Sequence, residues 1–187
     1  MRVIAGSARG VQLRQPKDRG TRPTAGRLRE ALFSMLEAAD VDLTEVLDLY
    51  AGTGAMGIEA LSRGAARCTF VESNARVVAV IRENLLRTGF QGRAEILTAR
   101  VGRWRAPKQA RYTLVMADPP YDDDGAWAAV AATVEHALAS GAAVVVEHAA
   151  RMPAPDTLAG LPLWRDRRQG DGAVAVYRAL QTREDVA

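Results

Sequence analysis

The stretch EVLDLYAGTGAMG, residues 45–57, decides the fold because an apolar strand pattern runs into a glycine-rich turn and then into a helical pattern. The turn contains a G-x-G-x-x-G pattern, formed by Gly52, Gly54 and Gly57. Such glycines let the backbone approach a ligand closely and direct free N–H groups at it. Nicotinamide dinucleotides and S-adenosylmethionine both use turns of this kind, so the motif predicts a nucleotide ligand and leaves its identity open.

Strand and helix patterns alternate on the C-terminal side of this turn. Strands are expected at residues 45–50, 68–72, 94–97, 112–117 and 142–148, and helices at 55–63, 75–87 and 125–138. Strands that alternate with helices are typical of a parallel sheet covered on both faces. We therefore predict an α/β protein with a Rossmann-like, doubly wound, mostly parallel sheet.

Each end of the chain adds a hairpin pattern to this sheet. Residues 1–16 read as two short strands around 7–10, followed by a helix from TRPT onward with Thr24 as its N-cap. Near the C-terminus, LWRDRRQ and AVAVYRA flank a Gly-Asp-Gly turn at 170–172, which predicts an antiparallel hairpin at the sheet edge. We expect an N-terminal extension, residues 1–42, and a main domain, residues 43–187.

Composition restricts the classes of protein. A chain of 187 residues with 48% hydrophobic and 25% charged residues suits one globular domain. It has neither an apolar run of the roughly 18 residues that a membrane helix needs nor the apolar core of a signal peptide, so a cytoplasmic location without membrane contact is expected. The single cysteine, Cys68, lies in an apolar run and predicts a buried thiol. His136 and His148 have no cysteines at metal-ligand spacing, so no metal site is expected.

The positive charge is concentrated at the N-terminus. Residues 1–30 hold eight Arg or Lys and two acidic residues, a balance of +6, so the remainder carries −3 of the net +3. The cluster is either a solvated surface or a footprint for phosphates, and seven of its eight basic residues are arginines, which favours bidentate phosphate contacts.

Acidic residues follow the first two predicted strands at the edge where such sheets bind ligands. Asp48 lies four residues before Gly52, and it either serves the ligand site or is a turn acid. Glu72 ends the second strand, where its carboxylate can accept hydrogen bonds from both ribose hydroxyls of an adenosine. Both candidate ligands share this feature, so Glu72 does not decide between them.

The fourth strand decides between them, because it runs into Asp118-Pro119-Pro120-Tyr121. Two consecutive prolines give a stiff turn without N–H donors, which presents carbonyl groups and a carboxylate. These acceptors suit the N–H donors of an exocyclic base amine, and the Tyr121 ring can stack on a base swung out of its helix. A hydride-transferring enzyme has no evident use for such a turn. Glu147 and His148 end the fifth strand, either at the rim of this target pocket or as ordinary strand-end polar residues.

Together, these motifs resemble a known family. Asp-Pro-Pro-Tyr and VLDLYAGTGAMGIEALSRGA resemble class I S-adenosylmethionine-dependent methyltransferases, and MRVIAGSARGVQL, TRPT with RLREALF, FVE, VVVEH and the closing hairpin extend the resemblance over nearly the whole chain. In this order they resemble the bacterial 16S rRNA guanine-N2 methyltransferases of the RsmD type. TRPT with RLREALF is the specific part, since Asp-Pro-Pro-Tyr alone also occurs in adenine-N6 methyltransferases.

The resemblance implies roles for particular residues. The turn at 51–54 would hold the methionine part of S-adenosylmethionine and Glu72 its ribose, and the expected cofactor set is Asp48, Tyr50, Ala51, Gly52, Thr53, Gly54, Glu72, Ser73 and Arg100. The expected catalytic set is Asp118, Pro119, Pro120 and Tyr121, and the expected RNA-binding set is Arg9, Arg14, Arg22, Thr24, Arg27 and Arg29. Three stretches depart from the family pattern: Thr98-Ala99-Arg100 where an Asp or Asn often recognises the adenine, Gly26, and Gln169-Gly170-Asp171-Gly172.

The expected activity is methylation of the N2 amine of a guanine in 16S rRNA, by a monomer that acts on naked rRNA or on an assembling small ribosomal subunit. The alternatives are an adenine-N6 methyltransferase acting on DNA or RNA, and a non-catalytic RNA-binding assembly factor. An intact Asp-Pro-Pro-Tyr argues against the non-catalytic factor, which does not need that turn.

Overall fold

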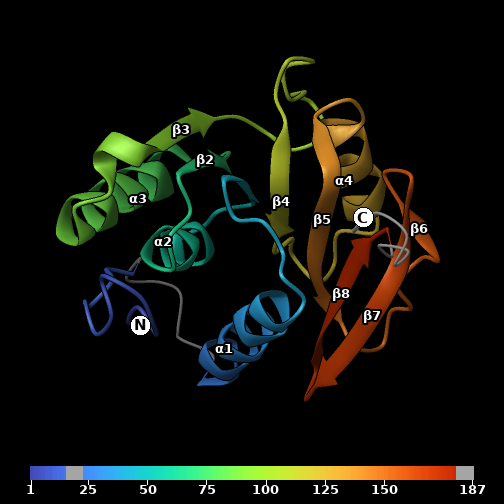
Figure 1. Ribbon diagram of the computed structural model, residues 1–187, viewed down its shortest axis with the longest axis horizontal. Coiled ribbons are helices and arrows are strands. Elements are labelled where there is room, and N and C mark those ends of the chain that lie inside the picture. Colours follow the sequence, from blue (N-terminus) through green and yellow to red (C-terminus); the bar gives the residue numbers. More distant parts are fainter. Residues whose placement is uncertain (16–22, 180–187) are drawn as a thin grey trace, which may run out of the picture.

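A single sheet of eight strands runs through the protein (Figure 1). The computed structural model describes residues 1–15 and 23–179. The strand order is β3-β2-β1-β4-β5-β8-β7-β6. The strands are β1 (Glu45–Leu49), β2 (Arg67–Glu72), β3 (Ala94–Thr98), β4 (Tyr112–Ala117), β5 (Leu138–Ala149), β6 (Thr157–Leu158), β7 (Leu161–Gln169) and β8 (Gly172–Arg178).

The sheet is doubly wound, as predicted. Strands β1 to β5 are parallel, and β1 lies between β2 and β4, so the direction of winding reverses beside β1. The β7–β8 hairpin is antiparallel, with β8 paired to β5 and β7 paired to β8, which confirms the predicted C-terminal hairpin. The short strand β6, which the sequence did not predict, pairs with β7 at the end of the sheet.

Helices cover both faces of the sheet and bury two apolar layers. The helices are α1 (Pro23–Ala38), α2 (Ala55–Ser62), α3 (Ala75–Thr88) and α4 (Ala126–Val134), with a short 3₁₀ helix, η1 (Gln91–Arg93). Apolar side chains of α1, α2 and α3 share one core with the N-terminal segment, and those of α4 pack on the other face (Figure 1). Alternate residues of each strand serve the two cores, which is the pattern expected of a sheet buried on both sides.

Helix α2 can pack closely against β2 because Gly57 has no side chain. A Cβ on Gly57 would collide with the ring of Phe70 and would lie 2.6 Å from the sulfur of Cys68. Cys68 is buried beneath the helix as an unpaired cysteine, which agrees with the buried thiol predicted from the sequence. The third glycine of the motif therefore serves helix–strand packing.

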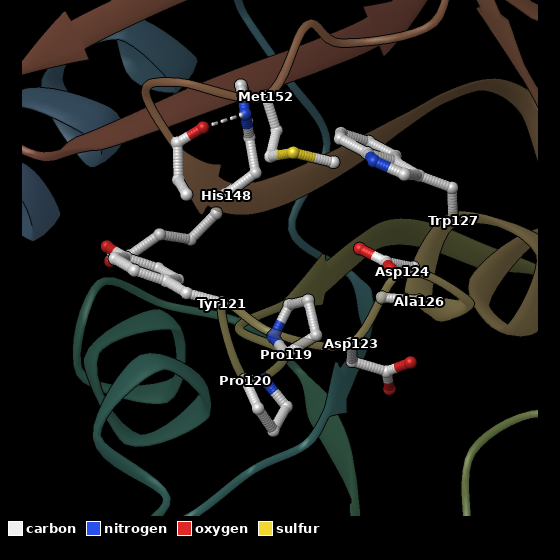
Figure 2. Close-up of a pocket in the computed structure, with 11 residues that line it drawn as sticks. Pro119, Pro120, Tyr121, Asp123, Asp124, Ala126, Trp127, His148 and Met152 are labelled. Atoms are coloured by element: carbon white, nitrogen blue, oxygen red, sulfur yellow. Dashed lines mark hydrogen bonds between the residues drawn. The ribbon is translucent and has the colours of Figure 1, made fainter.

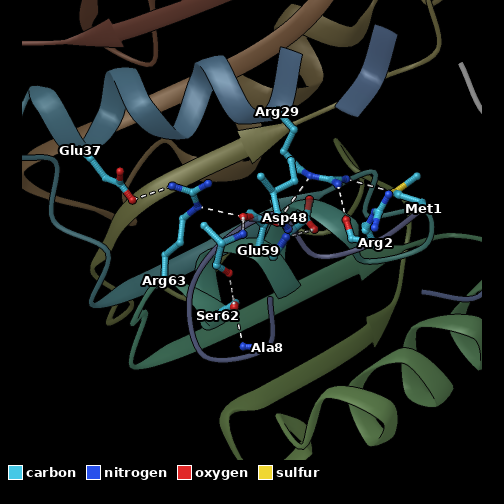
Figure 3. Close-up of polar contacts among 12 residues, drawn as sticks. Met1, Arg2, Ala8, Arg29, Glu37, Asp48, Glu59, Ser62 and Arg63 are labelled. Carbon is cyan, nitrogen blue, oxygen red and sulfur yellow. Dashed lines mark hydrogen bonds and ion pairs between the residues drawn. The ribbon is translucent and has the colours of Figure 1, made fainter. Parts of the chain in front are cut away.

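Residues 1–15 pack on α2 through buried polar contacts (Figure 3). The Glu59 carboxylate, which has no exposed surface, accepts hydrogen bonds from the backbone N–H groups of Ile4 (2.8 Å) and Ala5 (3.0 Å). At the end of the helix, the Ser62 hydroxyl accepts the N–H of Ala8 at 3.0 Å. The segment folds back on itself through an antiparallel bridge between Arg2 and Gln12, but residues 1–15 contain no regular strand. The prediction that this segment doubles back in an antiparallel manner is confirmed, and the prediction of two strands in it is wrong.

Two predicted boundaries are also wrong. The helix expected to reach residue 138 ends at Val134, and Leu138 already begins β5, because Leu138 pairs with Tyr112 and the Tyr112 N–H donates to the Ala137 carbonyl at 2.8 Å. Helix α1 begins at Pro23, so Thr24 lies in its first turn and is not the N-cap. Proline suits the first helical position because its ring fixes φ near the helical value and its missing N–H is not needed there.

Substituting Gly57 tests the close approach of α2 and β2. Gly57→Ala should destabilise the fold by about 1 to 3 kcal/mol, because the overlap with Phe70 and Cys68 outweighs the gain in helix propensity. The free energy of unfolding is measured by urea denaturation. Gly92→Ala is the matched control, since its added Cβ meets no atom within 4 Å and should change stability by less than about 0.5 kcal/mol. Equal stability of the Gly57→Ala protein and the parent would contradict this packing.

Candidate functional site

The carboxyl ends of four adjacent parallel strands meet at one edge of the sheet. The order β2-β1-β4-β5 brings Glu72, the turn at 50–54, the Asp-Pro-Pro-Tyr loop and Glu147 to this edge. The glycine turn and the Asp-Pro-Pro-Tyr loop leave neighbouring strands, and the Asp118 N–H donates to the Leu49 carbonyl at 3.4 Å. Ligands of doubly wound sheets bind at this edge, where the winding reverses.

The turn between β1 and α2 adopts a backbone conformation that favours glycine. Gly52 and Gly54 have φ values of 55° and 77°, and Tyr50, which is half-buried, has a φ of 56°. Gly54 occupies the N-cap position of α2 without a side-chain cap. A Cβ on Gly52 would meet only the Tyr50 carbonyl oxygen, at 3.8 Å, so the turn is open on this side.

Glu72 is held between the glycine turn and the start of α3. Its carboxylate accepts hydrogen bonds from the N–H of Gly52 at 3.0 Å and from the N–H of Asn74 at 2.8 Å. The hydroxyl of Ser73, an exposed residue, lies 3.4 Å from the same carboxylate. Two backbone donors on opposite sides fix the position of the Glu72 carboxylate and leave it half-buried at the edge of the sheet.

Asp48 lies beneath the glycine turn and is 2% exposed. Its carboxylate accepts the N–H of Gly57 at 2.9 Å, which ties the first turn of α2 to β1. Burial raises the pKa of Asp48 to about 8; the Gly57 N–H opposes this rise, and the negative charges of Asp118 and Glu72 add to it. The contacts in the structure are those of a buried turn acid, which was the alternative to a direct role in the ligand site.

The charge of Arg100 acts on Tyr50, at the start of the glycine turn. Arg100 is exposed and follows β3. Burial raises the pKa of Tyr50 to about 12, the charge of Asp123 adds to this effect, and the charge of Arg100 opposes it. The charge of Arg100 is therefore felt at Tyr50, at the start of the glycine turn.

The Asp-Pro-Pro-Tyr loop and the end of β5 line a pocket (Figure 2). The Tyr121 hydroxyl donates to the Glu147 carboxylate at 2.8 Å. This hydrogen bond fixes the Tyr121 ring beside the C-terminal end of β5. A Cβ on Gly172 would lie 2.7 Å from this hydroxyl, and a glycine in the C-terminal hairpin therefore makes room for Tyr121. The lining residues are Pro119, Pro120, Tyr121, Asp123, Asp124, Ala126, Trp127, Glu147, His148, Ala149 and Met152.

Within the loop, Asp118 and Pro120 are exposed and Pro119 is buried. The structure thus brings together Pro119, Pro120 and Tyr121 of the predicted catalytic set, with Asp118 at the entry to the loop. Glu147 and His148 also line this pocket, a placement that the sequence alone did not decide.

His148 joins the pocket to the C-terminal hairpin. The His148 ring is buried, and its Nε2 lies 3.2 Å from a carboxylate oxygen of Asp166 on β7. The indole of Trp127 packs against it with ring centroids 5.4 Å apart. Asp166 and Met152 were not predicted as site residues: Asp166 lies within the predicted strand 163–169, and Met152 follows the predicted strand 142–148 by four residues.

The basic residues of the N-terminus are not all available to a partner. Arg9, Arg14 and Arg27 are exposed, and Arg14 also forms an ion pair of 3.1 Å with Glu83. Arg9 follows the turn held beside Ser62, at the end of α2 opposite the glycine turn. Arg22 and the side chain of Thr24 lie outside the described residues.

Arg29 was expected to bind RNA, and the structure overturns this. It is 5% exposed and donates to the carbonyl of Arg2 at 2.9 Å and to the sulfur of Met1 at 3.1 Å (Figure 3). Its Nε lies 3.7 Å from the Glu59 carboxylate. The same carboxylate lies 2.9 Å from the Nε of Arg63, so two guanidinium groups face the buried Glu59. Arg29 is one of them, and its side chain is buried in the protein and not presented to a partner.

Within residues 1–15 and 23–179, no three His, Cys, Asp or Glu side chains are grouped as metal ligands. None of the helices in the same ranges is long and apolar enough to cross a membrane.

Comparison with known proteins covers nearly the whole chain. The family described as conserved hypothetical protein 95 matches residues 1–178. Ribosomal RNA small subunit methyltransferase D of Escherichia coli is 32% identical, over 95% of this chain and 89% of that protein. The solved structure of yhhF from Escherichia coli has a TM-score of 0.83 at 33% identity and covers 97% of this chain and 99% of its own. An RNA methyltransferase from Salinibacter ruber, solved with S-adenosyl-L-homocysteine, is 21% identical with a TM-score of 0.58, over 90% of this chain and 99% of its own, and shows the likeness of the fold alone.

The raised pKa of Asp48 predicts how stability depends on pH. Between about pH 4 and pH 8 the folded protein keeps this proton while the unfolded chain releases it, so Asp48 makes the free energy of unfolding fall as pH rises. Asp48→Asn removes this titration, and the amide oxygen can still accept the Gly57 N–H. From pH 5 to pH 8 the variant should gain on the order of 2 to 4 kcal/mol relative to the parent in urea denaturation.

The exposed substitution Asp42→Asn is the control and should follow the pH dependence of the parent. If Asp48→Asn also follows the parent at every pH, Asp48 does not hold a proton in the folded protein.

Proposed function

The chain belongs to the family described as conserved hypothetical protein 95, and from this premise we propose that it transfers the methyl group of S-adenosylmethionine to the N2 amine of a guanine in 16S rRNA. The observation that carries the proposal is the placement of the glycine turn and the Asp-Pro-Pro-Tyr loop on neighbouring strands, β1 and β4. A cofactor in the turn and a base at the loop would then be adjacent. The similarity to a ribosomal RNA small subunit methyltransferase supports 16S rRNA as the substrate and the bacterial cytoplasm as the location.

The turn and Glu72 have the chemistry needed to hold the cofactor. Gly52 leaves the turn open to close approach, and Glu72 presents a carboxylate that the backbone N–H groups of Gly52 and Asn74 keep in place. Such a carboxylate accepts hydrogen bonds from vicinal ribose hydroxyls. When bound here, S-adenosylmethionine supplies an electrophilic methyl group on its sulfonium sulfur.

The Asp-Pro-Pro-Tyr loop has the chemistry needed to hold the base amine. The lone pair of an exocyclic amine is delocalised into the ring, and acceptors on its two N–H groups help the nitrogen to pyramidalise and attack. The Asp118 carboxylate and the Pro119 carbonyl are these acceptors, and Asp118 takes the proton that the nitrogen loses as its bond to the methyl carbon forms. Tyr121, fixed by Glu147, stacks on the base. Positioning and exclusion of water provide most of the acceleration.

The exposed arginines Arg14 and Arg27 extend this site toward RNA. Arg14 lies on the segment packed against α2 and α3, and Arg27 lies near the start of α1. Guanidinium groups bind phosphates in a bidentate manner. Residues 1–42 would thus serve as an RNA-binding extension of a monomeric enzyme.

The identity of the product tests the activity. The enzyme is incubated with labelled S-adenosylmethionine and either an unmodified 16S rRNA transcript or unmodified small ribosomal subunits, and nucleosides are analysed by mass spectrometry. Label should appear in N2-methylguanosine. Label in N6-methyladenosine would favour the adenine-specific alternative, and RNA binding without methyl transfer would favour an assembly factor.

In the same assay, Asp118→Ala should reduce the rate of methyl transfer by at least about a hundredfold, comparable to the loss of one preorganised polar contact in an active site. Its affinity for S-adenosylhomocysteine, measured by calorimetry, should stay close to that of the parent. Asp122→Ala is the matched control, because Asp122 is an exposed aspartate of the same loop that lies outside the Asp-Pro-Pro-Tyr sequence. Full activity of the Asp118→Ala protein would remove Asp118 from the mechanism.

Salt dependence tests the RNA-binding arginines. Replacing Arg14 and Arg27 together by glutamine should reduce the slope of log affinity against log salt by roughly 0.7 to 0.9 for each lost phosphate contact. Arg111→Gln is the control, because this exposed arginine precedes β4 at the opposite edge of the sheet. An unchanged slope in the double variant would show that Arg14 and Arg27 do not contact phosphates and are ordinary solvated surface residues.

A further inference from the structure

The buried side chain of Asn84 connects two segments that are distant in sequence. Asn84 lies on α3 and has no exposed surface. Its Oδ1 accepts the backbone N–H of Arg14 at 2.6 Å, and its Nδ2 donates to the Arg14 carbonyl at 3.1 Å. The same Nδ2 donates to the Thr53 carbonyl at 2.9 Å. The side-chain amide of Asn84 is therefore hydrogen-bonded to the backbone of Arg14 and also to the backbone of Thr53 in the glycine turn.

The chemistry of asparagine suits this triple contact. A side-chain amide has an acceptor oxygen and two N–H donors, so it can pair with one backbone N–H and two carbonyls at once. Aspartate has no donor, and an apolar residue of the same size would leave three buried backbone groups without their contacts. The contact also lies in the core, where the helix that carries it cannot shift without disturbing its packing.

The two segments that Asn84 joins have different tasks in the proposed function. The Arg14 side chain is more than half exposed and pairs with Glu83, whereas its backbone is hydrogen-bonded to the Asn84 amide. Thr53 lies between Gly52 and Gly54, whose backbone conformations give the turn its shape. A single side chain is therefore hydrogen-bonded both to the Arg14 backbone and to the turn that would hold the cofactor.

We propose that Asn84 is a positioning residue that couples the RNA-facing segment to the cofactor turn, so that RNA and the cofactor each bind more tightly when the other is present. This inference rests on the proposed function. Coupling between two ligands is reciprocal, so the factor by which RNA improves cofactor affinity equals the factor by which the cofactor improves RNA affinity.

The test measures that factor without turnover. Filter binding of a labelled, unmodified 16S rRNA transcript, and in parallel of unmodified small ribosomal subunits, is compared with and without saturating S-adenosylhomocysteine. The parent protein should bind at least one of these RNA probes about fivefold or more tightly when the cofactor product is present. Asn84→Ala should bring this ratio close to one at a temperature where circular dichroism shows that the variant is folded.

Two further variants separate coupling from a merely structural role. Asn84→Asp keeps an acceptor for the Arg14 N–H and loses the donor to Thr53, so it should also lose the coupling, and it replaces Asn84→Ala if that protein does not fold. Glu83→Gln is the matched control from the adjacent position, because it removes the exposed ion pair with Arg14 and leaves the Asn84 contacts intact. Its ratio should equal that of the parent.

The possible failures are distinguishable. If the parent binds both ligands but its ratio is one, the coupling is refuted whatever the variants do. An unchanged ratio in a folded Asn84→Ala or Asn84→Asp protein would assign the coupling to other residues and also refute the inference. If the parent binds neither S-adenosylhomocysteine nor RNA, the proposed function fails and the coupling fails with it.

Discussion

The hydrogen bond from the Gly57 N–H to the buried Asp48 carboxylate, together with the missing side chain of Gly57, is the constraint on which the site depends. It seats α2 against β1 and β2. The start of this helix then shapes the glycine turn beside Glu72, and its later turns present Glu59 and Ser62 to the N-terminal segment. The position of one short helix thus sets both the ligand-facing turn and the place of the basic segment.

Much of the fold and part of the site could be predicted from sequence because the signals are local. Short apolar runs alternating with helical periodicity specify a parallel sheet, and glycine or proline limits the backbone wherever a strand ends. Glu72 and the Asp-Pro-Pro-Tyr loop were placed at one edge because the carboxyl ends of parallel strands lie together. This argument needs only the order of elements, and the strand order β2-β1-β4-β5 confirms it.

The rest could not be predicted because it depends on partners far away in sequence. Arg29 looks like its exposed neighbours, and only the folded chain shows that it is buried beside Glu59. His148 on β5 likewise contacts Asp166 on β7, although β8, the strand between them in the sheet, comes last in the sequence. The boundary between α4 and β5 was missed because its alanine-rich run suits either structure until pairing with Tyr112 decides. Asn84, within RENLL, suggests a structural hydrogen-bonding residue, but its partners carry no local signal, since its three contacts come from two other segments.

The sign of the charge at the carboxyl edge also bears on the choice of ligand. Glu72 and Asp118 lie close enough to Asp48 to raise its pKa further, so three carboxyl groups share one neighbourhood. A dinucleotide would bring a doubly negative pyrophosphate into this field, whereas S-adenosylmethionine brings a sulfonium and an ammonium cation with one carboxylate, a net positive charge. The glycine turn offers N–H groups to either molecule. Glu72 suits either molecule and Asp48, with its pKa raised to about 8, is mostly protonated at neutral pH, so the carboxylate that distinguishes this edge is Asp118. Its negative charge, on the strand beside the glycine turn, favours a cationic ligand over a pyrophosphate and lies outside the glycine motif.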